Sequence, residues 1–175
     1  MKKEKAKKME RVRDPKDDAM RFLGYRARTK AEVRQHLEAK GHGSAEIDET
    51  LAFLSQCGFV DDGDYCCQFI EYSMERGRGP LRIRRDLEGK GVDPQTVSLK
   101  LEELLSDEEE RDLAMGAAIK FLNRGSRPEG AFEGGEEDLG SKALDEKDLA
   151  RVGRRLASQG FHNGVIYYVL GKLRP

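Results

Sequence analysis

The sequence has no tryptophan, few aromatic residues (7%) and only three cysteines among its 175 residues. The cysteines are Cys57, Cys66 and Cys67, and the adjacent pair is poorly placed for a mutual disulfide or a CxxC metal site. We interpret all three as small buried apolar side chains in a reducing compartment. The cysteine content therefore argues against a disulfide-stapled secreted domain.

Long hydrophobic runs and an excess of one charge are also missing. No apolar segment approaches the ~20 residues that span a bilayer, and the basic leader has no apolar stretch behind it, unlike a signal peptide. The 32 Lys and Arg residues oppose 33 Asp and Glu residues, for a net charge of −1. We therefore expect no membrane association, and bulk charge alone predicts neither a nucleic-acid binder nor an acidic tail.

The residue patterns of common enzyme sites are absent. Gly89-Lys90 and Gly171-Lys172 lack the Ser or Thr of a P-loop, and no GxSxG elbow occurs. The three histidines do not fit an HExxH zinc motif, and the acidic cluster at 61–64 lacks the spacing and terminal glutamate of a calcium loop. We predict a protein that is not an enzyme, with no catalytic residue, no metal site and no cofactor.

A repeat with helical spacing is present instead. The segment that starts at Ala31 matches the one that starts at Leu81 without a gap, and a third copy lies a further 69 residues on. Each copy has an apolar i,i+4 pair, then a glycine, then an apolar stripe of amphipathic-helix spacing. The glycines are Gly41, Gly91 and Gly160, at points where a left-handed residue ends a helix at little cost.

The pattern predicts an all-α fold of three tandem three-helix repeats that form an elongated, curved array. The expected helices occupy residues 16–27, 30–40, 45–57, 62–76, 80–90, 94–105, 107–123, 146–159 and 163–173. Their start signals are capping boxes at Thr29/Glu32 and Ser106/Glu109, and N-caps at Gly79, Asp93, Asp145 and Asn163. The expected domains are a flexible basic leader at 1–13 and repeats at 14–60, 61–106 and 107–175, with an acidic glycine-rich insertion at about 124–142.

Charge is segmented along the chain. Residues 1–13 carry a net charge of +5 and 76–90 carry +4, whereas 102–112 and 129–148 each carry −6. Guanidinium groups bind phosphates or carboxylates through two parallel hydrogen bonds. We predict that arginines at equivalent positions of the repeats project from one side of the array and contact a partner. The alternative is that these helix faces are solvated and that their arginines form ion pairs within the chain. The candidates are Arg26, Arg28, Arg76, Arg78, Arg82, Arg84 and Arg85, and Arg154 and Arg155 would extend this side into the third repeat.

Two segments resemble the RecX family of regulatory proteins. The pattern L-x-x-R-x-R-[ST]-x-x-E-[LV] is followed by Leu23, Arg26, Arg28, Thr29, Glu32 and Val33. The run G-[YF]-[LIV]-[DN]-D occurs at 58–62, and G-P-x-x-[IL]-x-x-x-L-x-x-K-G occurs at 79–91. The resemblance covers residues 14–123 well and 143–175 more loosely. Of the candidate arginines, only Arg26 and Arg28 match a family pattern, and the others rest on charge.

This resemblance implies a bacterial cytoplasmic protein, without catalysis of its own, that acts in DNA repair, homologous recombination and the SOS response. It implies binding to RecA and to the RecA filament on single-stranded DNA, with restraint of strand exchange, ATP hydrolysis and coprotease activity. We expect a monomer. A weak direct contact with DNA stays open, and the alternative function is a DNA-binding module that acts independently of RecA.

Overall fold

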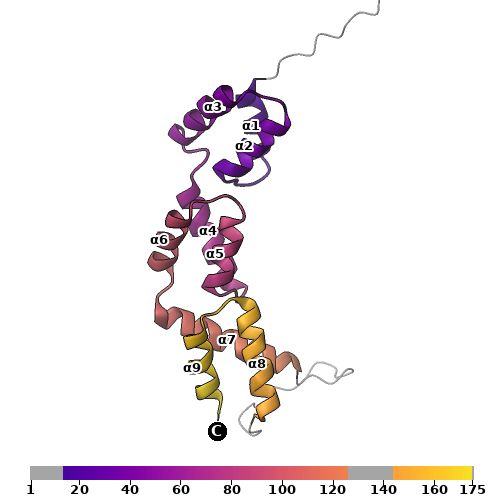
Figure 1. Cartoon of the computed structure of the whole chain (residues 1–175), viewed down its shortest axis with the longest axis vertical. Helices are drawn as coiled ribbons and strands as arrows, with labels where there is room; N and C mark the ends of the chain where they lie inside the picture. The colour runs from indigo at the N-terminus through magenta and orange to yellow at the C-terminus, as the bar shows by residue number, and fades with distance from the viewer. Residues whose placement is uncertain (1–13, 126–143, 175) are drawn as a thin grey trace, which may run out of the picture. The chain divides into compact units, whose positions relative to one another are not determined.

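The computed structural model describes residues 14–125 and 144–174, and every regular element in these ranges is an α-helix. The predicted all-α class is thereby confirmed. The leader at 1–13 and most of the predicted insertion lie outside the described residues. The helices, labelled in Figure 1, are α1 (Pro15–Leu23), α2 (Lys30–Ala39), α3 (Ser44–Gln56), α4 (Asp62–Glu75), α5 (Pro80–Glu88), α6 (Pro94–Leu104), α7 (Asp107–Gly125), α8 (Glu146–Gln159) and α9 (Asn163–Leu173).

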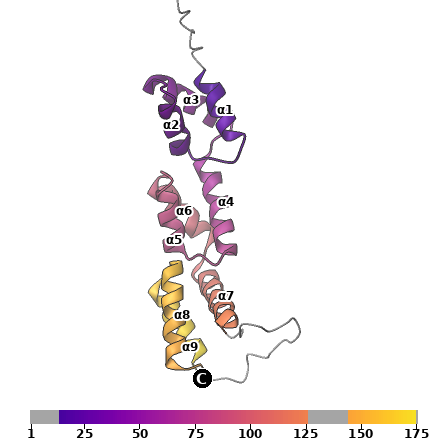
Figure 2. The same cartoon turned by 90° about the vertical axis from the view of Figure 1, so that its right-hand side faces the viewer.

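The helices form three groups of three, and each group encloses its own apolar core. The i,i+4 pairs Val33/Leu37 and Ile83/Leu87, identified from spacing, are fully buried in the first two cores. In the third group, Val152 and Leu156 of α8 are buried against apolar residues of α7 and α9, and the three helices lie side by side in Figure 2. Helical spacing therefore predicted the repeat and the residues at its centre.

The chain divides into two compact units at Asp61. The first unit contains α1–α3, and the second contains α4–α9. In the second unit, the Gly79 N–H donates to the Gln159 carbonyl at 2.9 Å, and the Leu81 N–H donates to the Gly160 carbonyl at 3.0 Å. These backbone bonds join the start of α5 to the turn between α8 and α9.

Most of the helix ends follow the predicted caps. Thr29 and Glu32 form both bonds of a capping box, and Asp93 accepts the Thr96 N–H. The turn glycines Gly41, Gly91 and Gly160 all have positive φ, at 87°, 77° and 86°. A left-handed turn therefore ends the second helix of each group.

Three local predictions are wrong. Asn163 is the first residue of α9 rather than its cap, because His162 takes the cap position and its N–H is accepted by Glu110 at 3.0 Å. The first helix ends at Leu23 rather than residue 27, since the chain leaves helical geometry after Gly24 to reach the extended cap residue Thr29. Of the three cysteines expected to be buried, only Cys66 is; Cys57 is exposed and Cys67 is half-buried.

Candidate functional site

The two arginines that match the family pattern both turn toward Glu32 on α2. One Arg26 guanidinium nitrogen lies 2.9 Å from Glu32 Oε1, and Arg28 lies 3.8 Å from the same oxygen. Arg28 also lies over the Phe22 ring, 4.2 Å from its centroid. Its side chain is only 17% exposed, against 46% for Arg26. Arg28 therefore braces the start of α2, and Arg26 is the more accessible of the two.

His36, one turn further along α2 than Glu32, contacts the same Phe22 ring as Arg28. Its ring stacks on Phe22 with the centroids 4.0 Å apart and the planes nearly parallel. Burial lowers the pKa of His36 from its ordinary value of 6.5, and the positive charge of Lys40 lowers this pKa further. The neutral imidazole is therefore favoured in the folded state.

The arginines of α5 differ in their partners. Arg84 donates to the Ser98 hydroxyl at 2.6 Å, which fixes α5 to α6. Arg78, just before α5, lies 3.2 Å from an Asp86 carboxylate oxygen, and Arg82 Nε lies 3.9 Å from the same oxygen. Arg85 is exposed and has no ion pair with any residue in 14–125 or 144–174. Arg82 and Arg85 are thus the residues of this helix most open to a partner.

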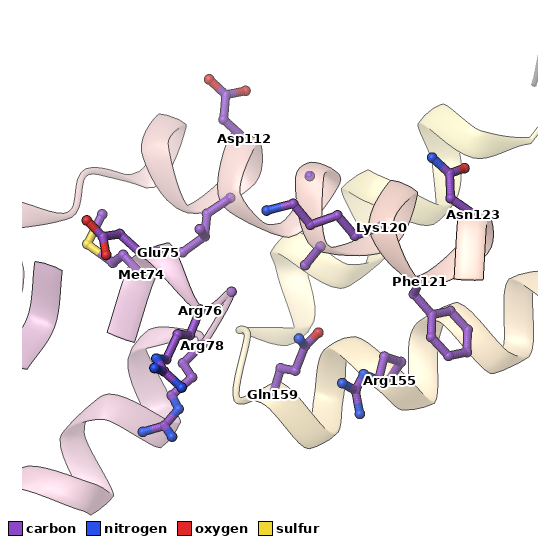
Figure 3. Close-up of a pocket in the computed structure, with 14 residues that line it drawn as sticks. Met74, Glu75, Arg76, Arg78, Asp112, Lys120, Phe121, Asn123, Arg155 and Gln159 are labelled. Carbon is purple, nitrogen blue, oxygen red and sulfur yellow. The ribbon is translucent and has the colours of Figure 1, made fainter. Parts of the chain in front are cut away.

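Arg76 and Arg78 take part in a different site, an open pocket of about 770 Å³ within the second unit. Figure 3 shows the two arginines together on one side, with Gln159 and Arg155 of α8 across from them and Lys120 of α7 nearby. The structure thus brings together two of the candidate arginines with Arg155, which the repeat comparison also singled out. Lys120 was missed, because an isolated lysine in a mostly apolar stretch gives no sequence signal.

Two glycines, Gly79 and Gly160, directly follow Arg78 and Gln159, which line this pocket, and lie against each other. A Cβ on Gly79 would overlap the Gly160 carbonyl oxygen, and a Cβ on Gly160 would lie 2.5 Å from the Arg82 nitrogen. Both are far inside normal contact distance, so the turn after α8 sits directly on the backbone at the start of α5 only because neither residue has a side chain. The glycine of the G-P pattern at 79–91 therefore has a packing role beyond that of a helix cap.

Neither a metal site nor a membrane helix occurs in the part of the chain that the structure describes. No group of three or more His, Cys, Asp or Glu side chains there is placed to hold a metal ion. None of the helices in these ranges is long and apolar enough to cross a membrane. The candidate functional features of the described residues are therefore the basic side chains of α5 and the pocket.

The fold and these surfaces define a helical-repeat protein with basic positions on its second and third repeats. The family model for the first three-helix domain of RecX matches residues 16–54, and the model for the second matches residues 61–100. A "Regulatory protein RecX" from Vibrio vulnificus is 31% identical over 155 residues, which cover 89% of this chain and 90% of that relative. The chain belongs to the RecX family of regulatory proteins.

Two further comparisons agree with this assignment. A "Regulatory protein RecX" from Halorhodospira halophila is 32% identical over 105 residues, or 60% of this chain and 63% of that relative. The crystal structure of RecX from Lactobacillus salivarius has a TM-score of 0.74 at 21% identity, covering 91% of this chain and 94% of that one. The structural likeness supports the three-helix repeat fold.

Proposed function

We propose that this protein regulates RecA without catalysis of its own. It binds RecA and the RecA filament on single-stranded DNA, and it restrains strand exchange, ATP hydrolysis and coprotease activity. The observation that carries the proposal is membership of the RecX family, seen in both domain models and along most of the Vibrio vulnificus relative.

Within this function, we assign the filament contact first to Arg82 and Arg85. Arg82 is 44% exposed on its side chain, and Arg85 is exposed without an ion partner among the described residues. A guanidinium group in this state binds a carboxylate or phosphate without first breaking a strong internal bond. Arg26 remains in the contact set, whereas the Arg28 and Arg84 side chains already support the fold.

The binding test uses RecA filaments assembled on immobilised single-stranded DNA with a slowly hydrolysed ATP analogue. We expect the wild-type chain to bind at a saturating ratio to RecA, and the Arg82→Ala/Arg85→Ala variant to bind about tenfold more weakly. Lys147→Ala/Lys172→Ala is the control, because it removes the same charge from exposed positions of α8 and α9 that are not candidate contact residues. No binding by the wild type would contradict the function, and equal binding by both variants would contradict only the residue assignment.

A further inference from the structure

We propose that the outer face of α9 binds the same face of a second copy of this chain and forms a dimer with two-fold symmetry. The face consists of two exposed tyrosines and two exposed glycines, Gly164, Tyr167, Tyr168 and Gly171. This inference goes beyond RecA regulation and does not depend on it. It replaces the monomer that we expect from the sequence.

The helix α9 is apolar on its outer side as well as on its inner side. Val165 and Val169 are buried in the core of the third group, whereas Tyr167 and Tyr168 are 74% and 44% exposed. No charged residue occurs in α9 before Lys172. A helix with apolar residues all round is normally covered on every side. The outer side of α9 is therefore an uncovered surface in the part of the chain that the structure describes.

The first two repeats show that the fold does not require an aromatic residue at this face. The repeat spacing places Tyr167 at the position of Asp48 in α3 and of Ser98 in α6. Each of those two polar residues is bonded to an arginine of the preceding helix. The third repeat has Gly153 in place of that arginine. The exposed tyrosine therefore serves a contact outside its own repeat.

The two glycines give this face a shape that accepts another helix. Gly164 and Gly171 are separated by about two helical turns and lie on a line between Tyr167 and Tyr168. Nothing lies within 4 Å of a Cβ built on either glycine. Two such helices can approach closely, with the tyrosines of each copy beside the glycines of the other.

The start of α7 borders this face and gives it an acidic end. Glu110 accepts the His162 N–H at the start of α9, and the Arg111 guanidinium lies 5.3 Å from the centre of the Tyr168 ring. Asp107 is exposed and lies one turn before Arg111, on the same side of α7. A carboxylate therefore stands at the end of the face where α9 begins.

The opposite end of the face is basic. Lys172 and Arg174 are exposed where α9 ends, and neither forms an ion pair with any residue in 14–125 or 144–174. In an antiparallel pair of α9 helices, these cations of one copy face Asp107 of the other. The two-fold axis makes this contact twice, so charge favours the antiparallel orientation and a second copy as the partner.

The first experiment measures the mass of the full chain, without RecA or DNA, by analytical ultracentrifugation over a concentration series. The wild type should form dimers as its concentration rises. Tyr167→Ser/Tyr168→Ser should weaken dimerisation at least about tenfold. The control is Leu99→Ser, because Leu99 is 62% exposed at the position of α6 that corresponds to Tyr168. Circular dichroism melts show whether each variant is folded.

Gly171→Ala separates docking from folding. The added methyl group has room within the chain, so the variant should stay folded but form weaker dimers. A wild type that is monomeric at every concentration, or equal association of the tyrosine variant and Leu99→Ser, would overturn the proposal. If the wild type is monomeric and only the tyrosine variant loses binding to RecA or to oligothymidylate, the face belongs to that partner instead.

A charge exchange tests the orientation. Asp107→Lys and Lys172→Glu should each weaken self-association, because each places like charges opposite each other. An equal mixture of the two variants should associate again, since both contacts in the mixed dimer then join opposite charges. A mixture that associates no better than either variant alone would overturn the antiparallel dimer.

Discussion

At the scale of single residues, the two glycines at the contact between α5 and the turn after α8 are the most constrained positions. Gly160 has φ of 86° and packs on the Arg82 backbone, while Gly79 packs on the Gly160 carbonyl. Both lack the space for a methyl group, and Gly160 also has a backbone conformation that L-residues rarely adopt. The junction between the second and third repeats therefore depends on these two residues.

Gly79→Ala should lower the free energy of unfolding by about 2–3 kcal/mol, because the added methyl group separates two backbone hydrogen bonds. Gly171→Ala in α9 is the matched control, since nothing lies within 4 Å of its added Cβ. It should stabilise the chain by up to about 1 kcal/mol. Urea unfolding followed by circular dichroism measures both. Equal midpoints for the two variants would contradict the packing role of Gly79.

His36 predicts a pH dependence of stability. Its pKa is lowered in the folded state from the ordinary value of 6.5, so the unfolded chain binds more protons below that pH. The contribution of His36 to stability is therefore full above pH 6.5 and decreases as pH falls through 6.5 toward the lower folded pKa.

His36→Phe should flatten this dependence while the aromatic stack on Phe22 is kept. Urea midpoints between pH 8 and pH 5 provide the test. The wild type should lose more stability than His36→Phe over this interval, and parallel curves would rule out His36 as the titrating group.

At the scale of the helices, a carboxylate ties the first helix of two of the three groups to the turn between the other two helices. Asp18 of α1 lies 3.1 Å from His42, and Glu110 of α7 lies 2.9 Å from the His162 ring. Each acid is the fourth residue of its helix and is 5% exposed. Tyr65 fills the same position of α4 and joins the apolar core instead.

Glu110→Gln should destabilise the chain by about 1–3 kcal/mol, because two charge-assisted hydrogen bonds to His162 become neutral. Glu108→Gln, an exposed position two residues earlier, removes the same charge and should change stability by less than about 0.5 kcal/mol. Thermal unfolding at neutral pH distinguishes them. Equal melting temperatures for the two variants would show that the hydrogen bonds between Glu110 and His162 contribute little to stability.

Most helix limits could be predicted because their signals are local. Capping residues such as Thr29 and Asp93 and the turn glycines act within a few residues of the helix end that they fix. The start of α9 was mispredicted because its N-terminus is satisfied by Glu110, which is 52 residues away in the chain. A local pattern contains no information about such a partner.

At the scale of the whole molecule, the candidate arginines could be found from charge, but their roles could not. Arg28 and Arg84 carry the same charge as Arg85, yet the first two are held by internal partners. The pocket is less predictable still, since Arg78 and Gln159 line it from 81 positions apart in the sequence and Lys120 gives no signal of its own. Tertiary packing decides which basic groups remain available for a partner.

Family membership makes RecA regulation the central claim, and RecA ATP hydrolysis on single-stranded DNA tests it most directly. The chain is titrated into a RecA reaction at fixed DNA and ATP. We predict that hydrolysis falls as the chain is added, and that Arg82→Ala/Arg85→Ala requires about tenfold more protein for the same inhibition. Unchanged hydrolysis with the folded wild-type chain at ratios up to one per RecA would contradict the account.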